Sequence, residues 1–220
     1  MITVKAETNE LFIDGAIGSD WMSEGVTAKA VGESLATIKG RAKIRINSPG
    51  GSADEGISIY NMLKRHPGGV DTHNEALAAS SASIIFMAGD KRTMERGAKL
   101  MIHCAHCVAI GNGAELQKMA EVLSVYDASM AEIYADAMGL PSDEVLALMA
   151  EETWYDPAAA LASGLATDIA PTVKRKTAAA AAWFKNPPAD LFDEHAIEKE
   201  GREIVSRISA AKIAEIRARM

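Results

Sequence analysis

The feature of this sequence that most constrains its fold is the alternation of strand-like with helix-like runs, which is clearest in the first half. Residues 43–47 alternate apolar and polar side chains, as a half-buried strand does, whereas residues 26–38 carry apolar side chains at helical spacing. Further strands are expected at 3–5, 11–17, 70–74 and 99–103, and further helices at 54–65, 115–138, 142–149 and 157–163. Residues 78–83 follow a strand and open another apolar helix. Strands that alternate with helices predict an α/β domain with mainly parallel strand pairing.

The composition changes after about residue 171. A basic run and an alanine run lead to Pro187 and Pro188, which is typical of a linker. Residues 193–220 are densely charged and carry isoleucines at helix-compatible spacing. We therefore expect a domain over residues 1–171, a linker over 172–192 and a charged, helical tail over 193–220.

Charge and hydropathy argue against several classes of protein. The net charge of −7 disfavours a broad nucleic-acid-binding surface, because such surfaces are basic. No window approaches the run of about 18 apolar residues that a membrane-spanning helix needs. The first residues lack the pattern of a secretory signal peptide, and two cysteines do not make a disulfide framework. We expect a cytoplasmic protein without nucleic-acid or membrane partners.

Three short motifs follow or end predicted strands and carry residues suited to catalysis. In Pro49-Gly50-Gly51, adjacent glycines allow backbone N–H groups to approach a ligand. Ser80 stands at a strand-to-helix corner, where the following N–H groups favour an anion. His103 ends a buried strand, and its ordinary pKa suits a general base. Taken singly, the motifs have simpler interpretations, namely a tight turn, a helix N-cap and a core histidine.

The order and spacing of the three motifs together indicate a protein family more specifically than any one motif does. Pro49-Gly50-Gly51, Ala78-Ala79-Ser80 and Met101-Ile102-His103 resemble those of the Clp protease proteolytic subunit, and more closely the Clp-type head maturation proteases of phages and prophages. The resemblance covers roughly residues 10–170. It implies a Clp/crotonase-type spiral of βαβ units with a long projecting helix, here residues 115–138. It also implies a homo-oligomeric ring, hydrolysis of peptide bonds and no cofactor.

The resemblance assigns a role to individual residues of the site. It implies that Ser80 is the nucleophile, that His103 is the general base, and that backbone N–H groups of Gly51 and Ser81 form the oxyanion hole. Ser81 itself and Ser83 remain alternatives for the nucleophile, although the Ala-Ala-Ser register favours Ser80.

The third member of the triad is located by its distance from a turn. Residues 162–165 resemble a turn that the Clp family has shortly after its catalytic acid. Counting back from this turn places the family's acid at Glu152, where the Clp subunit usually has aspartate. A glutamate can still orient an imidazole, as it does in some hydrolase triads. Glu151 and Asp156 remain alternatives for this role.

The run His103-Cys104-Ala105-His106-Cys107 offers a rival site. Structural zinc sites usually pair two separated ligand clusters, and the sequence has no second cysteine pair. In a strand over residues 100–104, moreover, His103 and Cys104 would point to opposite faces. Cys104 as a nucleophile has no indicated partner. We therefore predict neither a metal nor a cofactor.

For the biological role, the charged tail favours a phage or prophage head maturation protease that acts on a capsid or scaffold protein. The alternative is a housekeeping Clp-type subunit that works with an ATP-dependent unfoldase. Two further classes stay open, namely a crotonase-like enzyme that is not a peptidase and a catalytically inactive assembly protein with the same fold.

Overall fold

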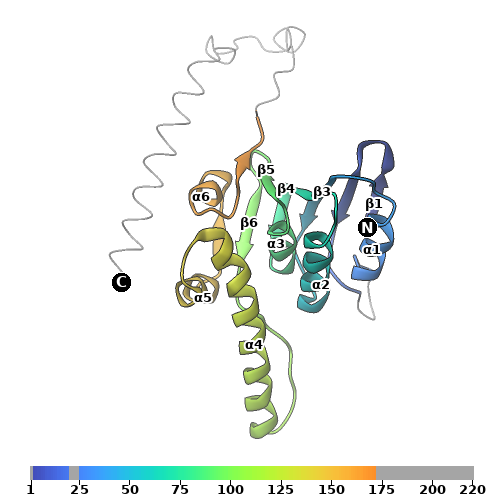
Figure 1. The fold of residues 1–220 in the computed structure, drawn as a ribbon. Helices are drawn as coiled ribbons and strands as arrows, with labels where there is room; N and C mark the ends of the chain where they lie inside the picture. Colours follow the sequence, from blue (N-terminus) through green and yellow to red (C-terminus); the bar gives the residue numbers. More distant parts are fainter. Residues whose placement is uncertain (1, 20–24, 172–220) are drawn as a thin grey trace, which may run out of the picture. The chain divides into compact units, whose positions relative to one another are not determined.

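The structure, a computed structural model, describes residues 2–19 and 25–171 (Figure 1). Its helices and strands belong to one compact unit, Met1–Ala170. The expected linker 172–192 and tail 193–220 lie outside the described residues, so both stay predictions. No helix in the described part of the chain is long and apolar enough to cross a membrane.

An eight-stranded sheet forms the centre of this unit. Its main path runs β1-β2-β3-β4-β5-β8, and β6 pairs with β4 and β7. Only the β1–β2 and β6–β7 pairs are antiparallel, among the described strands. The predicted α/β class with mainly parallel pairing is thus confirmed. The strands are β1 Ile2–Lys5, β2 Glu10–Asp14, β3 Ala42–Ser48, β4 Val70–Ala79, β5 Lys91–Met94, β6 Lys99–Ile102, β7 Thr153–Tyr155 and β8 Asp168–Ile169.

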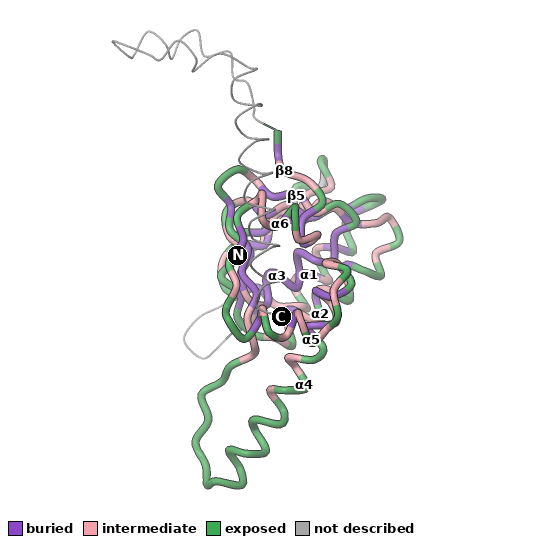
Figure 2. The backbone as a smooth tube through the Cα atoms, turned by 90° about the vertical axis from the view of Figure 1, so that its left-hand side faces the viewer, coloured by how far each residue is buried: buried purple, intermediate pink, exposed green. Residues whose placement is uncertain are grey.

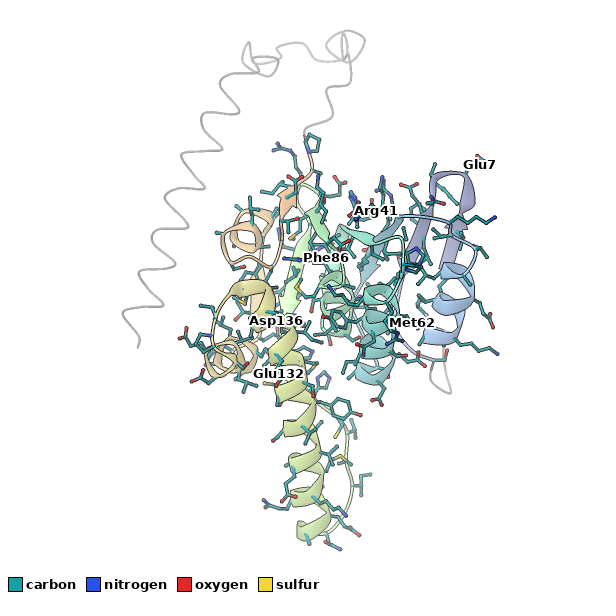
Figure 3. The ribbon with its side chains drawn as sticks, viewed as in Figure 1. Glu7, Arg41, Met62, Phe86, Glu132 and Asp136 are labelled. Carbon is teal, nitrogen blue, oxygen red and sulfur yellow. The ribbon has the colours of Figure 1, made fainter. Side chains whose placement is uncertain are left out.

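Helices cover one face of the sheet and one of them projects from it. In Figures 1 and 2, α1, α2 and α3 lie on the same face of the sheet, and α4 extends away from it. Met62 of α2 lies against α1, where Gly32 leaves room for its sulfur atom (Figure 3). The helices are α1 Ala28–Leu35, α2 Ala53–Lys64, α3 Ser81–Phe86, α4 Gly113–Met138, α5 Ser142–Ala150 and α6 Pro157–Ala162, with a 3-10 turn at Ala6–Thr8.

The core fills the space between the sheet and these helices. In β3, Ile44 and Ile46 are fully buried and alternate with polar residues, as predicted for a half-buried strand. From the helices, Ile59 and Phe86 are fully buried as well (Phe86 is labelled in Figure 3). This packing holds the strand ends that carry the candidate site.

Some elements differ from the sequence-based prediction. Strand β4 continues beyond the predicted end at Asn74 to Ala79, because Ala78 and Ala79 pair with β6. Strands β5, β7 and β8 were not predicted. Ser52 caps α2, whereas Asp54 lies in its first turn and accepts a 2.6 Å hydrogen bond from the Tyr126 hydroxyl.

The long helix α4 is exposed over its first half and reaches the core only with its last turns. A capping box formed by Asn112 and Glu115 starts it, and left-handed Gly139 ends it. Its last turns are anchored in the core, whereas nearly all of residues 106–125, called the arm below, are exposed (Figure 2). Exposed large apolar side chains on the arm are Val108, Ile110, Leu116, Met119, Val122 and Val125.

Candidate active site

The pairing of three neighbouring parallel strands brings the sequence motifs together. Strand β4 pairs with β3 on one side, Ala78 opposite Ser48, and with β6 on the other, Ala79 opposite Met101. Parallel strands end at the same edge of a sheet. The glycine motif after β3, Ser80 after β4 and His103 after β6 therefore meet at one place.

The side chains of Ser80 and His103 face each other across this edge. Ser80 Oγ lies 2.8 Å from His103 Nε2, which is a hydrogen-bond distance. Although Ser80 occupies the N-cap position of α3, its side chain makes no capping hydrogen bond. The simple N-cap interpretation of Ser80 therefore does not hold, and its hydroxyl is available to the imidazole.

The backbone of Ser80 adopts a conformation that is unusual for a residue other than glycine. Its φ of +54° and ψ of −131° cost on the order of 1–3 kcal/mol, which the surrounding structure must offset. The Ser80 N–H is held by the Met101 carbonyl at 3.1 Å. A sharp strand-to-helix turn of this kind presents a serine hydroxyl at the top of a sheet, as the nucleophile elbow of α/β-hydrolases does.

The environment of His103 favours its neutral form. Partial burial lowers the pKa of His103 below its ordinary value of 6.5, and nearby His106 lowers this pKa further. The carboxylates of Glu152 and Asp127 act in the opposite direction. The His103 and His106 rings lie 5.2 Å apart. A neutral imidazole at neutral pH can accept a proton from Ser80.

The glycine motif packs directly against the serine turn. A Cβ atom on Gly50 would lie 2.6 Å from Ser80 Cβ and 2.6 Å from the Ala79 carbonyl oxygen. A Cβ atom on Gly51 would lie 2.1 Å from the Ile17 carbonyl oxygen. Both residues also have positive φ angles, +91° and +148°. Only glycine fits this close approach without strain.

Two backbone donors point to an anion site beside Ser80. In the described part of the chain, the N–H groups of Gly51 and Ser81 have no hydrogen-bond acceptor. Both residues line the cleft that contains Ser80 and His103. The cleft has a volume of about 650 Å³ and is lined by Pro49, Gly50, Gly51, Ser52, Ala53, Ser80, Ser81, Met101, His103, Ala105, His106, Met130 and Glu152.

Of the three acids considered for the triad, only Glu152 lines this cleft. Glu152 has a φ of +49°, and its Oε1 accepts a 3.1 Å hydrogen bond from the Trp154 indole N–H. No hydrogen bond joins Glu152 to His103 within the described residues. Asp156 caps α6 by accepting from Ala159 N, and Glu151 ends α5. Asp156 thus has a structural role at the start of α6.

The cysteine and histidine run lies beside the site. Strand β6 ends at Ile102, so strand alternation does not separate His103 from Cys104 as we expected. Burial and nearby Asp127 raise the pKa of the Cys104 thiol, which leaves it protonated and poorly nucleophilic at neutral pH. Over residues 2–19 and 25–171, no three His, Cys, Asp or Glu side chains are grouped to hold a metal ion.

Sequence reasoning missed several residues near the site. Asp127 lies on α4, 24 positions after His103, and no local pattern marks it as a neighbour of the imidazole. Met101 on β6 and Met130 on α4 also line the cleft. His106 was considered only as a metal ligand. These contacts depend on where α4 crosses the strand ends, which spacing does not reveal.

Comparison with known proteins shows the family of this chain. The family model of the Clp protease matches residues 6–173. The ATP-dependent Clp protease proteolytic subunit 3 of Streptomyces avermitilis is 33% identical over 129 residues, 58% of this chain and 59% of that protein. The proteolytic subunit of Deinococcus radiodurans is 32% identical over 127 residues, 56% of this chain and 62% of that protein. The chain thus spans about three fifths of these curated relatives.

A solved structure gives the same result for the fold. A ClpP1 point mutant from Listeria monocytogenes superposes with a TM-score of 0.66, covering 76% of this chain and 94% of that chain at 21% identity. The expected Clp/crotonase-type fold is confirmed by this similarity. Because the family model matches more than half of its length, the chain belongs to the Clp protease family.

Proposed function

We propose that this chain is a serine endopeptidase whose nucleophile is Ser80 and whose general base is His103. The observation that carries the proposal is the 2.8 Å contact between Ser80 Oγ and His103 Nε2. A serine hydroxyl becomes nucleophilic when a positioned imidazole takes its proton. The lowered pKa of His103 supports this role, because the base must be unprotonated before it acts.

In the proposed reaction, Ser80 Oγ attacks the carbonyl carbon of a peptide bond while His103 Nε2 accepts the hydroxyl proton. The N–H groups of Gly51 and Ser81 donate to the oxyanion of the tetrahedral intermediate. Protonated His103 then gives its proton to the leaving amine, and the acyl group stays on Ser80. Water, deprotonated by His103, releases the acyl group. Glu152 stabilises the charged imidazole electrostatically.

The proposal is tested by treating the full chain with a fluorophosphonate probe and mapping the adduct by mass spectrometry. We expect a single adduct on Ser80 that is lost in Ser80→Ala and in His103→Ala. Ser34→Ala, a serine on α1 away from the cleft, serves as the matched control and should keep the adduct. No adduct on Ser80 in folded wild-type protein would refute the peptidase proposal, as would an adduct on Ser81 or Ser83.

We also propose that the chain forms a homo-oligomeric ring and that the arm is part of its interface. Val108 and Ile110 are 98% and 99% exposed, and the α4 part of the arm adds four more exposed apolar side chains. An apolar surface of this kind is typical of an interface. Val125→Asp should reduce the mass measured by light scattering, whereas Leu161→Asp, an equally apolar site on α6, should not. An unchanged mass for Val125→Asp would contradict the interface.

For the biological role, we propose a head maturation protease that cleaves a capsid or scaffold protein. The resemblance of the motifs and the charged residues 193–220 support this role. The names of the relatives, which are ATP-dependent proteolytic subunits, favour the second candidate, a subunit that works with an ATP-driven unfoldase. Defined cleavage of a purified capsid or scaffold precursor without ATP would support the first role. Turnover only with an unfoldase and ATP would support the second.

A further inference from the structure

Two buried hydroxyl groups outside the proposed catalytic set are connected to the Ser80 backbone. Ser83 on α3 and Tyr134 on α4 are 0% and 1% exposed. Ser83 Oγ lies 2.6 Å from the Ser80 carbonyl oxygen and 2.7 Å from the Tyr134 hydroxyl. Tyr134 belongs to the buried part of α4, the part on which Figure 3 labels Glu132 and Asp136. The hydroxyls thus link α4 to the turn that carries the nucleophile.

The direction of each hydrogen bond follows from counting protons. A carbonyl oxygen only accepts, so the single Ser83 hydroxyl proton must be donated to Ser80 O. Ser83 Oγ is then left as an acceptor, and the Tyr134 hydroxyl donates to it. Burial raises the pKa of Tyr134 far above neutrality, so this proton is always present. The order Tyr134 to Ser83 to Ser80 carbonyl is therefore fixed.

This chain of hydrogen bonds acts on the peptide group between Ser80 and Ser81. The Ser80 carbonyl accepts from Ser83 Oγ and from the Ser83 backbone N–H, the latter at 2.9 Å. The peptide group is planar and trans, so its C=O and N–H point in opposite directions. Holding the Ser80 C=O toward the buried hydroxyls therefore turns the Ser81 N–H away from them. Ser81 lines the cleft and its N–H has no acceptor among the described residues.

We propose that Ser83 and Tyr134 are positioning residues that hold the Ser80–Ser81 peptide so that the Ser81 N–H stays aimed at the oxyanion. The effect of these two residues on catalysis rests on the proposed function. Ser80 has a positive φ, and this strained turn needs contacts that stop its peptide from rotating. The two hydroxyls supply such contacts from inside the core, where competing water is excluded.

The kinetic test compares fluorophosphonate inactivation of wild type, Ser83→Ala and Tyr134→Phe. We expect the limiting inactivation rate to fall about tenfold in Ser83→Ala and about threefold in Tyr134→Phe, with unchanged probe affinity. A whole oxyanion donor is worth about a hundredfold, and the Ser83 N–H still holds the carbonyl in both variants. The pH profile should not move, because His103 is untouched. A purely structural role would lower the melting temperature and leave the rate of the folded protein unchanged.

The chain contains a matched control for the tyrosine substitution. Tyr155 is also buried, and its hydroxyl has no hydrogen-bond partner in the described part of the chain. Tyr155→Phe removes the same atom from the same kind of environment. It should leave the inactivation rate unchanged. Equal effects of Tyr134→Phe and Tyr155→Phe on this rate would overturn the proposal.

A second readout does not require peptidase activity. Ser80-Ser81 is the only Ser-Ser pair in the sequence, so protein labelled with ¹³C-carbonyl and ¹⁵N serine gives one carbonyl-to-amide NMR correlation. The resonance of the Ser80 carbonyl carbon should move upfield in Ser83→Ala, because the carbonyl loses a hydrogen bond, and in Tyr134→Phe, because that hydrogen bond is weakened. The resonance should stay in place in Tyr155→Phe. If wild type does not react with the probe, the peptidase proposal fails, and this shift still decides whether the hydroxyls hold the peptide. An unchanged resonance in Ser83→Ala would refute the inference.

Discussion

Replacing Gly50 with alanine tests whether the glycine motif sets the position of the nucleophile. The new Cβ would lie 2.6 Å from Ser80 Cβ, whereas ordinary contacts begin at 3.4 Å. The serine turn or the glycine motif must therefore move by about 0.8 Å, because the same Cβ also meets the Ala79 carbonyl oxygen at 2.6 Å. Neither contact atom is the end of a flexible side chain that could rotate away.

The expected effect of Gly50→Ala has two parts, a loss of stability and a loss of reaction rate. A positive φ for alanine costs about 1–2 kcal/mol of folding free energy wherever it occurs. The displacement of Ser80 adds a loss of rate, since a misplacement of about 1 Å at a reacting group can cost about a hundredfold. We therefore expect Gly50→Ala to lose stability moderately and to react with the fluorophosphonate probe about a hundredfold more slowly than wild type.

Gly97→Ala separates these two effects. Gly97 has a φ of +82°, but a Cβ atom there would meet nothing within 4 Å. This variant should show the loss of stability in urea unfolding and keep the wild-type inactivation rate. The reasoning is refuted if Gly50→Ala, measured under conditions where it is folded, reacts within threefold of Gly97→Ala.

Three further predictions concern single side chains. His106→Ala removes a group that lowers the pKa of His103, so the acid limb of the rate–pH profile should move to higher pH; a shift to lower pH would contradict this. Glu152→Gln removes a charge that raises the same pKa, so the limb should move to lower pH and the rate fall about tenfold, whereas Glu151→Gln, outside the cleft, should match wild type. The Arg92 guanidinium donates to three backbone carbonyls, so Arg92→Leu should lower the unfolding free energy by about 2 kcal/mol or more in urea titration, and an unchanged midpoint would exclude this role.

The sequence allowed prediction of those parts of the site that follow from strand order. Ser80 and His103 each come directly after a parallel strand, and neighbouring strand ends necessarily meet. Local propensity was less reliable where pairing decided the outcome. Residues 76–79 are mostly alanine, a good helix former, yet they form strand because β6 offers hydrogen-bond partners.

The contributions of α4 could not be predicted. Asp127 and Tyr134 reach the site because the helix crosses the strand ends at one particular angle, which depends on packing across the whole core. The side-chain direction of Glu152 could not be predicted from the sequence either, since it depends on a positive φ angle and on the neighbouring indole of Trp154. Position in the chain therefore identified Glu152 as a candidate without showing how its carboxylate points.

The continuity of α4 has a consequence for how the arm can vary in length. The helix is unbroken from Leu116 on the arm to buried Tyr134, about 27 Å along its axis. Each residue advances an α-helix by about 1.5 Å and rotates it by about 100°, so one inserted residue would turn the whole outer surface relative to the anchored end. Insertions of about 7 or 11 residues, close to two or three full turns, are the shortest that nearly restore the original angular phase. The arm can therefore lengthen or shorten only in discrete steps.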